Sequence, residues 1–290
     1  MAKEAWGRWG AEDERGALNL IETEEVRRAV SLVKEGRVFS LAQPISEKMM
    51  IPPHRPNVMH FMGRDGGDYA AGAKRPGGFQ FAEDTVVLPL HLGTHIDGLC
   101  HAWYDDCLYN GFPGNSVRST VGATRCGVEK FSPIVTRGVL LDIVRLHGRA
   151  VPNGTAIGRQ MIEAACARGG VEIRKGDAVL IRTGWLESQD GIDPDFNQEP
   201  GLDLDAALRL AEAGAALIGT DNFAVEVLPF ASGTVFPVHQ RLIRDYGMAL
   251  VEGLVLEPLG DAGATSFLFV AAPLPIVGAT ASPMTPVAVL

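Results

Sequence analysis

Three of the chain's seven histidines and one aspartate lie close together in the stretch HLGTHIDGLCH, residues 91–101. They are His91, His95 and His101, with Asp97 between them. Neutral imidazoles and a carboxylate are ligands that suit Zn²⁺, Mn²⁺ or Fe²⁺. A site with only three protein ligands keeps a position open for water or substrate, which is the catalytic arrangement. The stretch therefore predicts a catalytic divalent-metal site with His91, His95 and Asp97 as ligands.

The spacing of these side chains sets a condition on the backbone. In an extended strand side chains alternate between faces, so the three histidines and Asp97, all odd-numbered, would share one face. A straight strand rises about 3.3 Å per residue and would hold His91 and Asp97 about 20 Å apart, whereas ligands lie about 2 Å from their ion. Gly93 can supply the bend because it has no Cβ. We expect a strand up to His91, a turn at Gly93-Thr94 and convergence of the ligands.

His101 admits two interpretations. It is either a fourth ligand or a base that takes a proton from water and passes it to a leaving group. A Cys100–His101 nucleophile pair is disfavoured because adjacent residues of an extended chain point in opposite directions. Cys100 is better interpreted as a small buried apolar residue. The chain has no Gly-x-Ser-x-Gly motif, which argues against a serine hydrolase.

Composition narrows the class of protein. The 290 residues are 46% hydrophobic and 21% charged, as in ordinary globular proteins. The net charge of -9 and the lack of a basic tract argue against nucleic acid or an anionic membrane as partner. No stretch approaches the roughly 20 apolar residues of a membrane helix. No apolar signal segment begins the chain, so a cytoplasmic location with four free thiols is expected.

Strands that alternate with single helices predict an α/β fold. Strands are expected at 38–42, 85–91, 139–144, 177–182, 215–219, 248–251 and 267–271, and helices at 23–36, 157–168, 203–213 and 236–246. We expect an N-terminal helical extension (1–36), one main domain (37–272) and an extended C-terminal arm (273–290). The extension serves either a subunit contact or packing on its own domain.

Residues 44–84 are rich in Pro, Gly, Met and His and show no clear periodicity. A loop this long is unusual unless it is functional or ordered by a partner. Its methionines and phenylalanines could form an apolar lid for an aromatic or lipophilic substrate, or could simply pack. Phe79, Phe81 and Trp103 are the candidates for a substrate pocket.

The stretch at 91–101 resembles the His-x-Gly-Thr-His-x-Asp-x-Pro-x-His signature of the metal-dependent cyclase family. That family includes bacterial kynurenine formamidases, isatin hydrolases and zinc-dependent lactamases. GDAVLIRTGW (176–185), LIGTDNFAVE (217–226) and VHQRLIRDYGMALVEGL (238–254) are similar to later family segments and occur in the family's order. The chain departs from the signature at Leu99, where the family's proline would restrict φ on the approach to His101.

The resemblance implies a swivelling β/β/α domain with mixed sheets. It implies that His91, His95 and Asp97 are the metal ligands and that His101 is the catalytic histidine. It also implies that His239 and Glu252 either bind a second metal or line the site. A homodimer or homotetramer is the assembly it leads us to expect.

These observations favour a metal-dependent hydrolase that uses Zn²⁺ or Mn²⁺ to cleave a C–N bond of an amide, formamide or lactam in a small molecule. Two alternatives stay open. One is a metal-dependent cyclase or lyase acting on a carbonyl substrate. The other is a non-catalytic metal- or ligand-binding protein, which closed coordination by all three histidines and Asp97 would favour.

Overall fold

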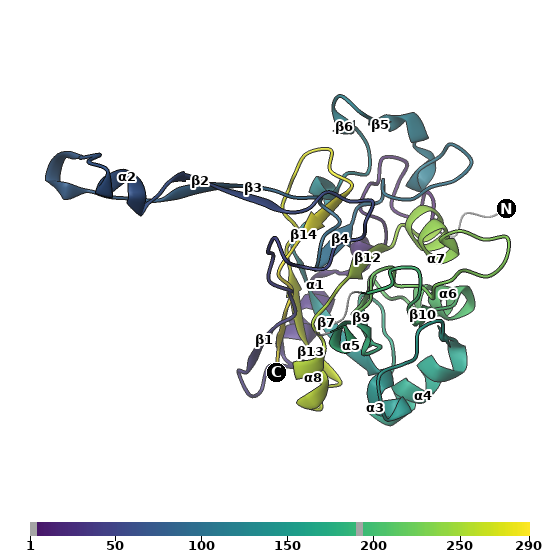
Figure 1. Cartoon of the computed structure of the whole chain (residues 1–290). Coiled ribbons are helices and arrows are strands. Elements are labelled where there is room, and N and C mark those ends of the chain that lie inside the picture. Colours follow the sequence, from purple (N-terminus) through teal and green to yellow (C-terminus); the bar gives the residue numbers. More distant parts are fainter. Residues whose placement is uncertain (1–4, 190–193) are drawn as a thin grey trace.

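A mixed sheet of nine strands forms the centre of the computed structural model, which describes residues 5–189 and 194–290 (Figure 1). Across the sheet the strands are β1 (Val38–Ser40), β15 (Val287–Val289), β13 (Ser266–Ala271), β7 (Ile134–Asp142), β9 (Ala178–Arg182), β11 (Leu217–Thr220), β12 (Ala249–Glu252), β4 (His95–Asp97) and β14 (Ala281–Pro283). The four strands β7, β9, β11 and β12 are parallel, and the strands on either side pair antiparallel. The prediction of an α/β fold with a mixed sheet is confirmed.

The parallel strands β9, β11 and β12 are buried along their whole length. A strand that is buried on both faces has a continuous run of apolar residues. The sequence therefore predicted these strands well. The carboxyl ends of parallel strands lie at the same end of the sheet. Glu252 is the last residue of β12, and β12 is the neighbour of β4, the strand of the His91–His101 stretch. The register partner of Glu252 on β4 is His95.

Two of the longer helices lie close to their predicted positions, and the third, predicted at 23–36, begins as predicted but ends at Val30. The longer helices are α1 (Thr23–Val30), α4 (Arg159–Gly169) and α6 (Leu204–Glu212); shorter ones are α3 (Ile143–His147), α5 (Trp185–Ser188) and α8 (Glu257–Asp261). Asp203 caps α6 by accepting a hydrogen bond from the Ala206 amide, and Gly170 ends α4 in the left-handed region. The helix predicted at 236–246 is α7 (Pro237–His239) continued by a π-helical segment, Gln240–Asp245.

Short elements complete the body. They are 3₁₀ turns at Gly16–Leu20, Tyr109–Gly111, Gly114–Ser116 and Val128–Lys130, the parallel pair β8 (Ala156–Ile157) and β10 (Gly201–Leu202), and the antiparallel pair β5 (Val117–Arg118) and β6 (Gly122–Ala123). No helix in the described ranges is both long and apolar enough to cross a bilayer.

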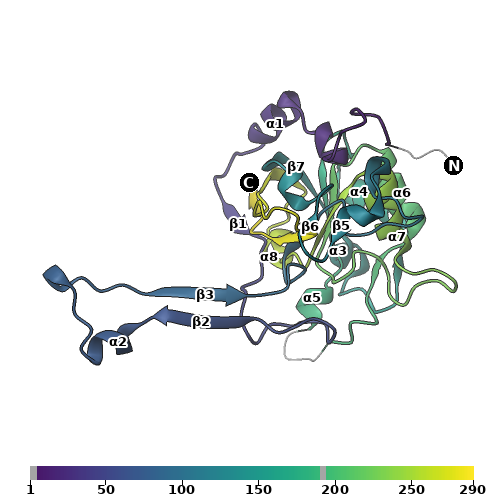
Figure 2. The same ribbon diagram turned by 90° about the horizontal axis from the view of Figure 1, so that it is seen from above.

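A β-hairpin built from residues 59–87, here called the arm, projects far from the body (Figures 1 and 2). It consists of β2 (Met59–Arg64) and β3 (Glu83–Val87), with α2 (Gly66–Ala70) and a 3₁₀ turn (Pro76–Gly78) toward its tip. The segment expected as a loop at 44–84 thus contains regular structure.

The strand expected at 85–91 was placed wrongly. The observed β3 ends at Val87 in the arm, the chain is irregular through the next residues, and β4 begins only at His95. Pro89 has no amide hydrogen to give to a sheet, which accounts for the interruption.

The N-terminal segment packs against its own domain. Ala17, Leu18 and Leu20 are buried, and the Ala17 amide donates to the carbonyl of Gly247 at 2.7 Å. Gly16 has φ +57°, and a Cβ on it would lie 1.9 Å from the Gly247 oxygen. Glycine is required at this close backbone approach.

The C-terminal residues, expected as an extended arm, belong instead to the central sheet. β15 lies between β1 and β13, and β14 pairs with β4, so that Ala281 faces Asp97. The prolines that suggested an arm are compatible with this position because β14 is an edge strand, where a missing amide hydrogen is tolerated.

Candidate metal centre

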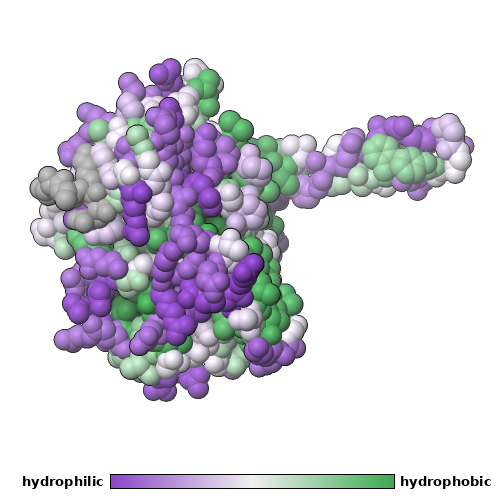
Figure 3. Space-filling model, turned by 180° about the vertical axis from the view of Figure 1, so that it is seen from behind, coloured by the Kyte–Doolittle hydropathy of each residue, from purple (hydrophilic) through white to green (hydrophobic). Residues whose placement is uncertain are grey.

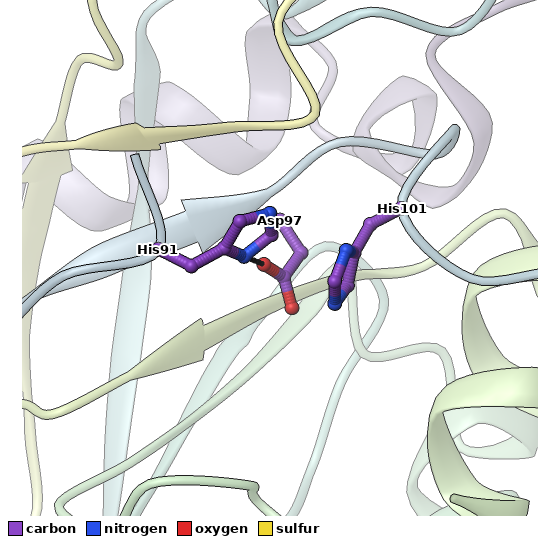
Figure 4. Close-up of side chains that lie close together, drawn as sticks. All are labelled: His91, Asp97 and His101. Carbon is purple, nitrogen blue, oxygen red and sulfur yellow. Dashed lines mark ion pairs between the residues drawn. The ribbon is translucent and has the colours of Figure 1, made fainter. Parts of the chain in front are cut away.

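Six side chains predicted from the sequence meet where β4 lies beside the end of β12. They are His91, His95, Asp97, His101, His239 and Glu252. Two groups of them hold ligand atoms within 4.8 Å of one another: His91 with Asp97 and His101, and His95 with Asp97 and Glu252. Figure 4 shows His91 and His101 on either side of Asp97. Asp97 belongs to both groups and is therefore the centre of the cluster.

The contacts within the cluster are short. Asp97 Oδ1 lies 2.9 Å from His91 Nδ1 and 3.7 Å from His95 Nε2. Glu252 contacts His95 and His239, with 3.2 Å from Oε2 to His95 Nε2 and 3.2 Å from Oε1 to His239 Nε2. The imidazole of His101 lies over that of His91, with ring centroids 4.0 Å apart. One small volume thus collects imidazole nitrogens and carboxylate oxygens from three separate parts of the chain.

The turn predicted at Gly93-Thr94 is present. Gly93 has φ +53°, a left-handed conformation that glycine adopts without strain. The Thr94 hydroxyl donates to the carbonyl of Gly253 at 2.7 Å and accepts from the Gln43 amide at 2.9 Å. It therefore ties the turn to the end of β12. His95 Nδ1 donates to the carbonyl of Gly93, which leaves Nε2 free to face the cluster.

The donor set fits a divalent cation. His95 Nε2 and both carboxylate oxygens of Asp97 are buried, yet none has a partner in hydrogen-bond geometry. Buried polar atoms almost always have such a partner, and a buried carboxylate without one is costly. Convergent imidazole nitrogens and carboxylate oxygens are what Zn²⁺ or Mn²⁺ requires. A cation held by these atoms would satisfy them together.

The carboxylates of Asp97 and Glu252 favour positive charge at the centre of the cluster. Burial opposes ionisation of Asp97, but the surrounding imidazoles, His101 foremost, hold its pKa well below the usual range. Burial also opposes protonation of His95, but Glu252 raises the pKa of that imidazole above its ordinary value. Both shifts express the attraction of the two carboxylates for positive charge, which a bound cation would supply.

His101 differs from the other histidines of the cluster. Burial, together with the neighbouring His91 and His239, lowers the pKa of His101 to about 4. Its imidazole is therefore neutral near pH 7 and has a lone pair available to accept a proton. Leu99, at the position of the family's proline, is fully buried and does not prevent His101 from reaching Asp97.

His239 is oriented by a carboxylate that the sequence analysis missed. Glu226 Oε1 accepts from His239 Nδ1 at 2.7 Å, and the same carboxylate accepts the backbone amides of Val238 and His239. Burial works against protonation of His239, yet Glu226 and then Glu252 raise its pKa to about 10. Glu226 thereby directs Nε2 toward Asp97 and Glu252.

A cavity of about 460 Å³ lies beside the cluster. Its lining includes His101, His239 and Glu252 from the cluster, together with the aromatic rings of Trp103, Phe223 and Phe236. The structure thus brings Trp103 to the site. Phe79 and Phe81, by contrast, lie stacked on each other in the arm and do not line this cavity.

Cys100 does not have the environment of a nucleophile. Its side chain is fully buried, and burial raises the pKa of the thiol to about 12. The thiolate is the nucleophilic form, so this cysteine is inert near neutral pH.

A family model described as "Putative cyclase" matches residues 39–227, which is more than half of the chain. The chain belongs to the cyclase family. A relative named kynurenine formamidase, from Sphingopyxis alaskensis, is 30% identical over 199 residues, covering 69% of this chain and 76% of its own length.

Solved structures give the same fold for this family member. One described as a novel cyclase has a TM-score of 0.92 with 38% identity, covering 98% of this chain and 99% of its own. An isatin hydrolase bound to the product analogue thioisatinate has a TM-score of 0.66 with 21% identity, covering 93% and 99%.

Two further site residues of this cyclase-family chain carried no usable signal in the sequence. Arg55 and Phe223 both line the cavity beside the cluster. Arg55 lies in an irregular Pro-rich stretch, and Phe223 follows β11 within the LIGTDNFAVE segment. Neither has a spacing that relates it to the histidines, so only the folded chain brings them to the site.

Proposed function

We propose that the chain is a metal-dependent hydrolase that cleaves the C–N bond of an amide, formamide or lactam in a small molecule. One observation carries the proposal: buried ligand atoms of His95 and Asp97, close to other polar atoms but without a partner in hydrogen-bond geometry, meet a neutral histidine, His101, at an aromatic-lined cavity. The names of the similar proteins, kynurenine formamidase and isatin hydrolase, support this reaction class.

The ion would be held by His91, His95 and Asp97, with Zn²⁺ or Mn²⁺ as the candidates. A bound divalent cation supplies Lewis acidity, which polarises a carbonyl and makes water a stronger nucleophile. Glu252 and His239 complete the wall of the site and would take part in binding if a second ion were present.

His101 moves the proton in this scheme. Its neutral imidazole accepts the proton of the attacking water, and the resulting imidazolium donates it to the departing nitrogen. The C–O bond forms as the C–N bond breaks, and the products are a carboxylate and an amine. The hydroxyl of Thr94 is already engaged with Gly253 and Gln43, so it has no part in the proton transfer.

The test combines metal content with turnover. The untagged protein, purified without chelator, is subjected to elemental analysis and then assayed with formanilide, an isatin-type lactam and a simple aryl ester. About one ion per chain with C–N cleavage is the expected result, and about two would add His239 and Glu252 as ligands. A chain that binds neither Zn²⁺ nor Mn²⁺, or a metal-loaded chain that hydrolyses none of these compounds, would contradict the proposal.

A further inference from the structure

Arg55 lies at the rim of the metal centre without a role in the proposed chemistry. Its Nη1 donates a hydrogen bond to the carbonyl oxygen of His91, so the guanidinium lies next to a predicted metal ligand. The same guanidinium lies over the ring of Phe223, with 5.1 Å from Cζ to the ring centroid. Arg55 lines both the cavity beside the cluster and the smaller hollow that adjoins it.

The charge of Arg55 is not balanced by an ion pair. Within residues 5–189 and 194–290 no carboxylate forms a salt bridge with it. Burial lowers the pKa of Arg55, while Glu252 and Asp97, which belong to the cluster, act on it from a greater distance and raise it. Arginine nevertheless stays charged in proteins. A half-buried guanidinium therefore keeps donors that are available to a ligand in the cavity.

Aromatic rings line the same cavity as this cation. Phe223, Phe236 and Trp103 line the cavity, and the ring of Phe236 meets that of His239 edge-on at 5.1 Å between centroids. Such walls favour a flat apolar group. His101 lines the same cavity, so a planar ligand there has its reacting bond near the cluster and its neighbouring substituent near Arg55.

We propose that Arg55 is a specificity-determining residue that binds a carboxylate on an aromatic substrate, placed ortho to the amide nitrogen. This inference rests on the proposed function. The hydrogen bond to the backbone carbonyl of His91 holds the guanidinium beside a predicted ligand, so we propose that it reaches a substituent next to the amide nitrogen, which on an aromatic ring is the ortho position. A guanidinium binds a carboxylate through two parallel hydrogen bonds, which the point charge of lysine does not reproduce.

Two substrates that differ only in the carboxylate test the inference. Formate release is measured from 2-formamidobenzoate and from formanilide with the Zn²⁺-loaded wild type, Arg55→Met and Arg55→Lys. We expect Arg55→Met to reduce the ratio of kcat/KM between the two substrates by about 10–100-fold, mainly through KM, as for the loss of a charged hydrogen bond. Arg55→Lys should restore part of the ratio. Arg159→Met, at an exposed ion pair on α4, is the control.

A binding measurement provides a readout that does not depend on turnover. Calorimetric titration with 2-aminobenzoate and with aniline should give at least tenfold tighter binding of the carboxylate in the wild type, and a loss of most of that difference in Arg55→Met. An unchanged difference would place the carboxylate on the metal and overturn the inference.

The remaining outcomes separate this inference from the proposed function. An equal fall of kcat for both substrates in Arg55→Met would assign Arg55 to the reacting oxygen and overturn the carboxylate role. If the wild type hydrolyses neither these two substrates nor the isatin-type lactam, the proposed function fails, and the titration still decides whether Arg55 binds the carboxylate. Arg55→Lys keeps the positive charge, so it carries the test if Arg55→Met does not fold.

Discussion

At the scale of single residues, the site depends on the contacts between carboxylates and imidazoles, which set the protonation state of each group. Asp97 is fully buried and belongs to both groups of candidate ligands. Glu226 is equally buried but contacts His239 on the side away from the cluster. His101 stands apart because its imidazole is neutral. The environments of His101 and Glu226 predict two separate effects of substitution.

Substitution of His101 by alanine should separate catalysis from binding. We expect His101→Ala to retain the metal and to lose roughly 10²–10⁴-fold in kcat, because a general base is removed while the metal ligands stay in place. Elemental analysis and turnover of formanilide on the same sample make the comparison. Loss of the metal would instead make His101 a ligand.

Glu226→Gln keeps the shape of the side chain but removes the negative charge that orients His239. We expect metal affinity to fall by about 10–100-fold if the His239–Glu252 pair binds an ion, the usual effect of losing a carboxylate behind a ligand. Glu199→Gln is the matched control, since Glu199 is also buried and accepts two backbone amides, from Phe223 and Ala224. Equal affinities of the two variants in a chelator competition would show that Glu226 has only a structural role.

At the scale of elements, the N-terminal segment supports the helix that contains His239. The indole of Trp6 donates to the carbonyl of Arg244, and the Ala17 amide donates to Gly247. Both acceptors lie in or just after the π-helical segment Gln240–Asp245. The Tyr104 hydroxyl also donates to Asp245 at 2.7 Å, which links this segment to the loop after His101.

Gly16→Ala tests this packing. The new Cβ would overlap the Gly247 carbonyl, so we expect a loss of about 1–3 kcal/mol in the free energy of unfolding, as for other overpacked sites. Gly36→Ala is the matched control, because its φ of +71° is similar but nothing lies within 4 Å. Urea unfolding of both variants measures the difference. Equal stabilities would show that the segment can move away from Gly247 without cost.

At the scale of the whole molecule, the arm is the part of the chain that does not pack on the body. Figure 3 shows it standing clear of the body, with hydrophobic residues on its surface. Met59, Phe61, Met62 and Phe79 are exposed there. A two-stranded hairpin is only marginally stable alone in water, so a surface for the arm to pack on is expected. Closed symmetric assembly of identical chains is the usual way to provide one.

The predicted homodimer or homotetramer can be tested through the arm. We expect Phe61→Ser combined with Met62→Ser to shift the protein toward the monomer, because the arm loses apolar area that a second copy would cover. Sedimentation velocity measures the change, with Val277→Ser as the control, an exposed apolar residue outside the arm. A wild-type monomer, or a variant with unchanged assembly, would contradict this role of the arm.

The sequence by itself determined the features that depend on neighbouring residues, namely the candidate ligands and the regular elements. The spacing of His91, His95 and Asp97, with Gly93 able to turn, predicted convergence of these side chains. The chain brings each histidine to Asp97, but His91 and His95 belong to two different groups of candidate ligands. The apolar runs of β9, β11 and β12 and the caps of α4 and α6 predicted those elements because burial and capping act over a few residues. The family resemblance pointed to His239 and Glu252, which local spacing could not relate to the motif.

Only the tertiary structure decided the contacts between distant segments. Glu252 meets His95 because β12 and β4 are neighbours in the sheet, and Glu226 meets His239 across an irregular loop. Arg55 lies at the site although its stretch of sequence has no periodicity. Phe79 and Phe81, which were predicted for the pocket, lie in the arm. The C-terminal residues join the sheet beside Asp97. The order of the strands and the paths of the loops depend on packing between segments far apart in the chain. The local sequence pattern of one segment does not reveal which distant segment it contacts.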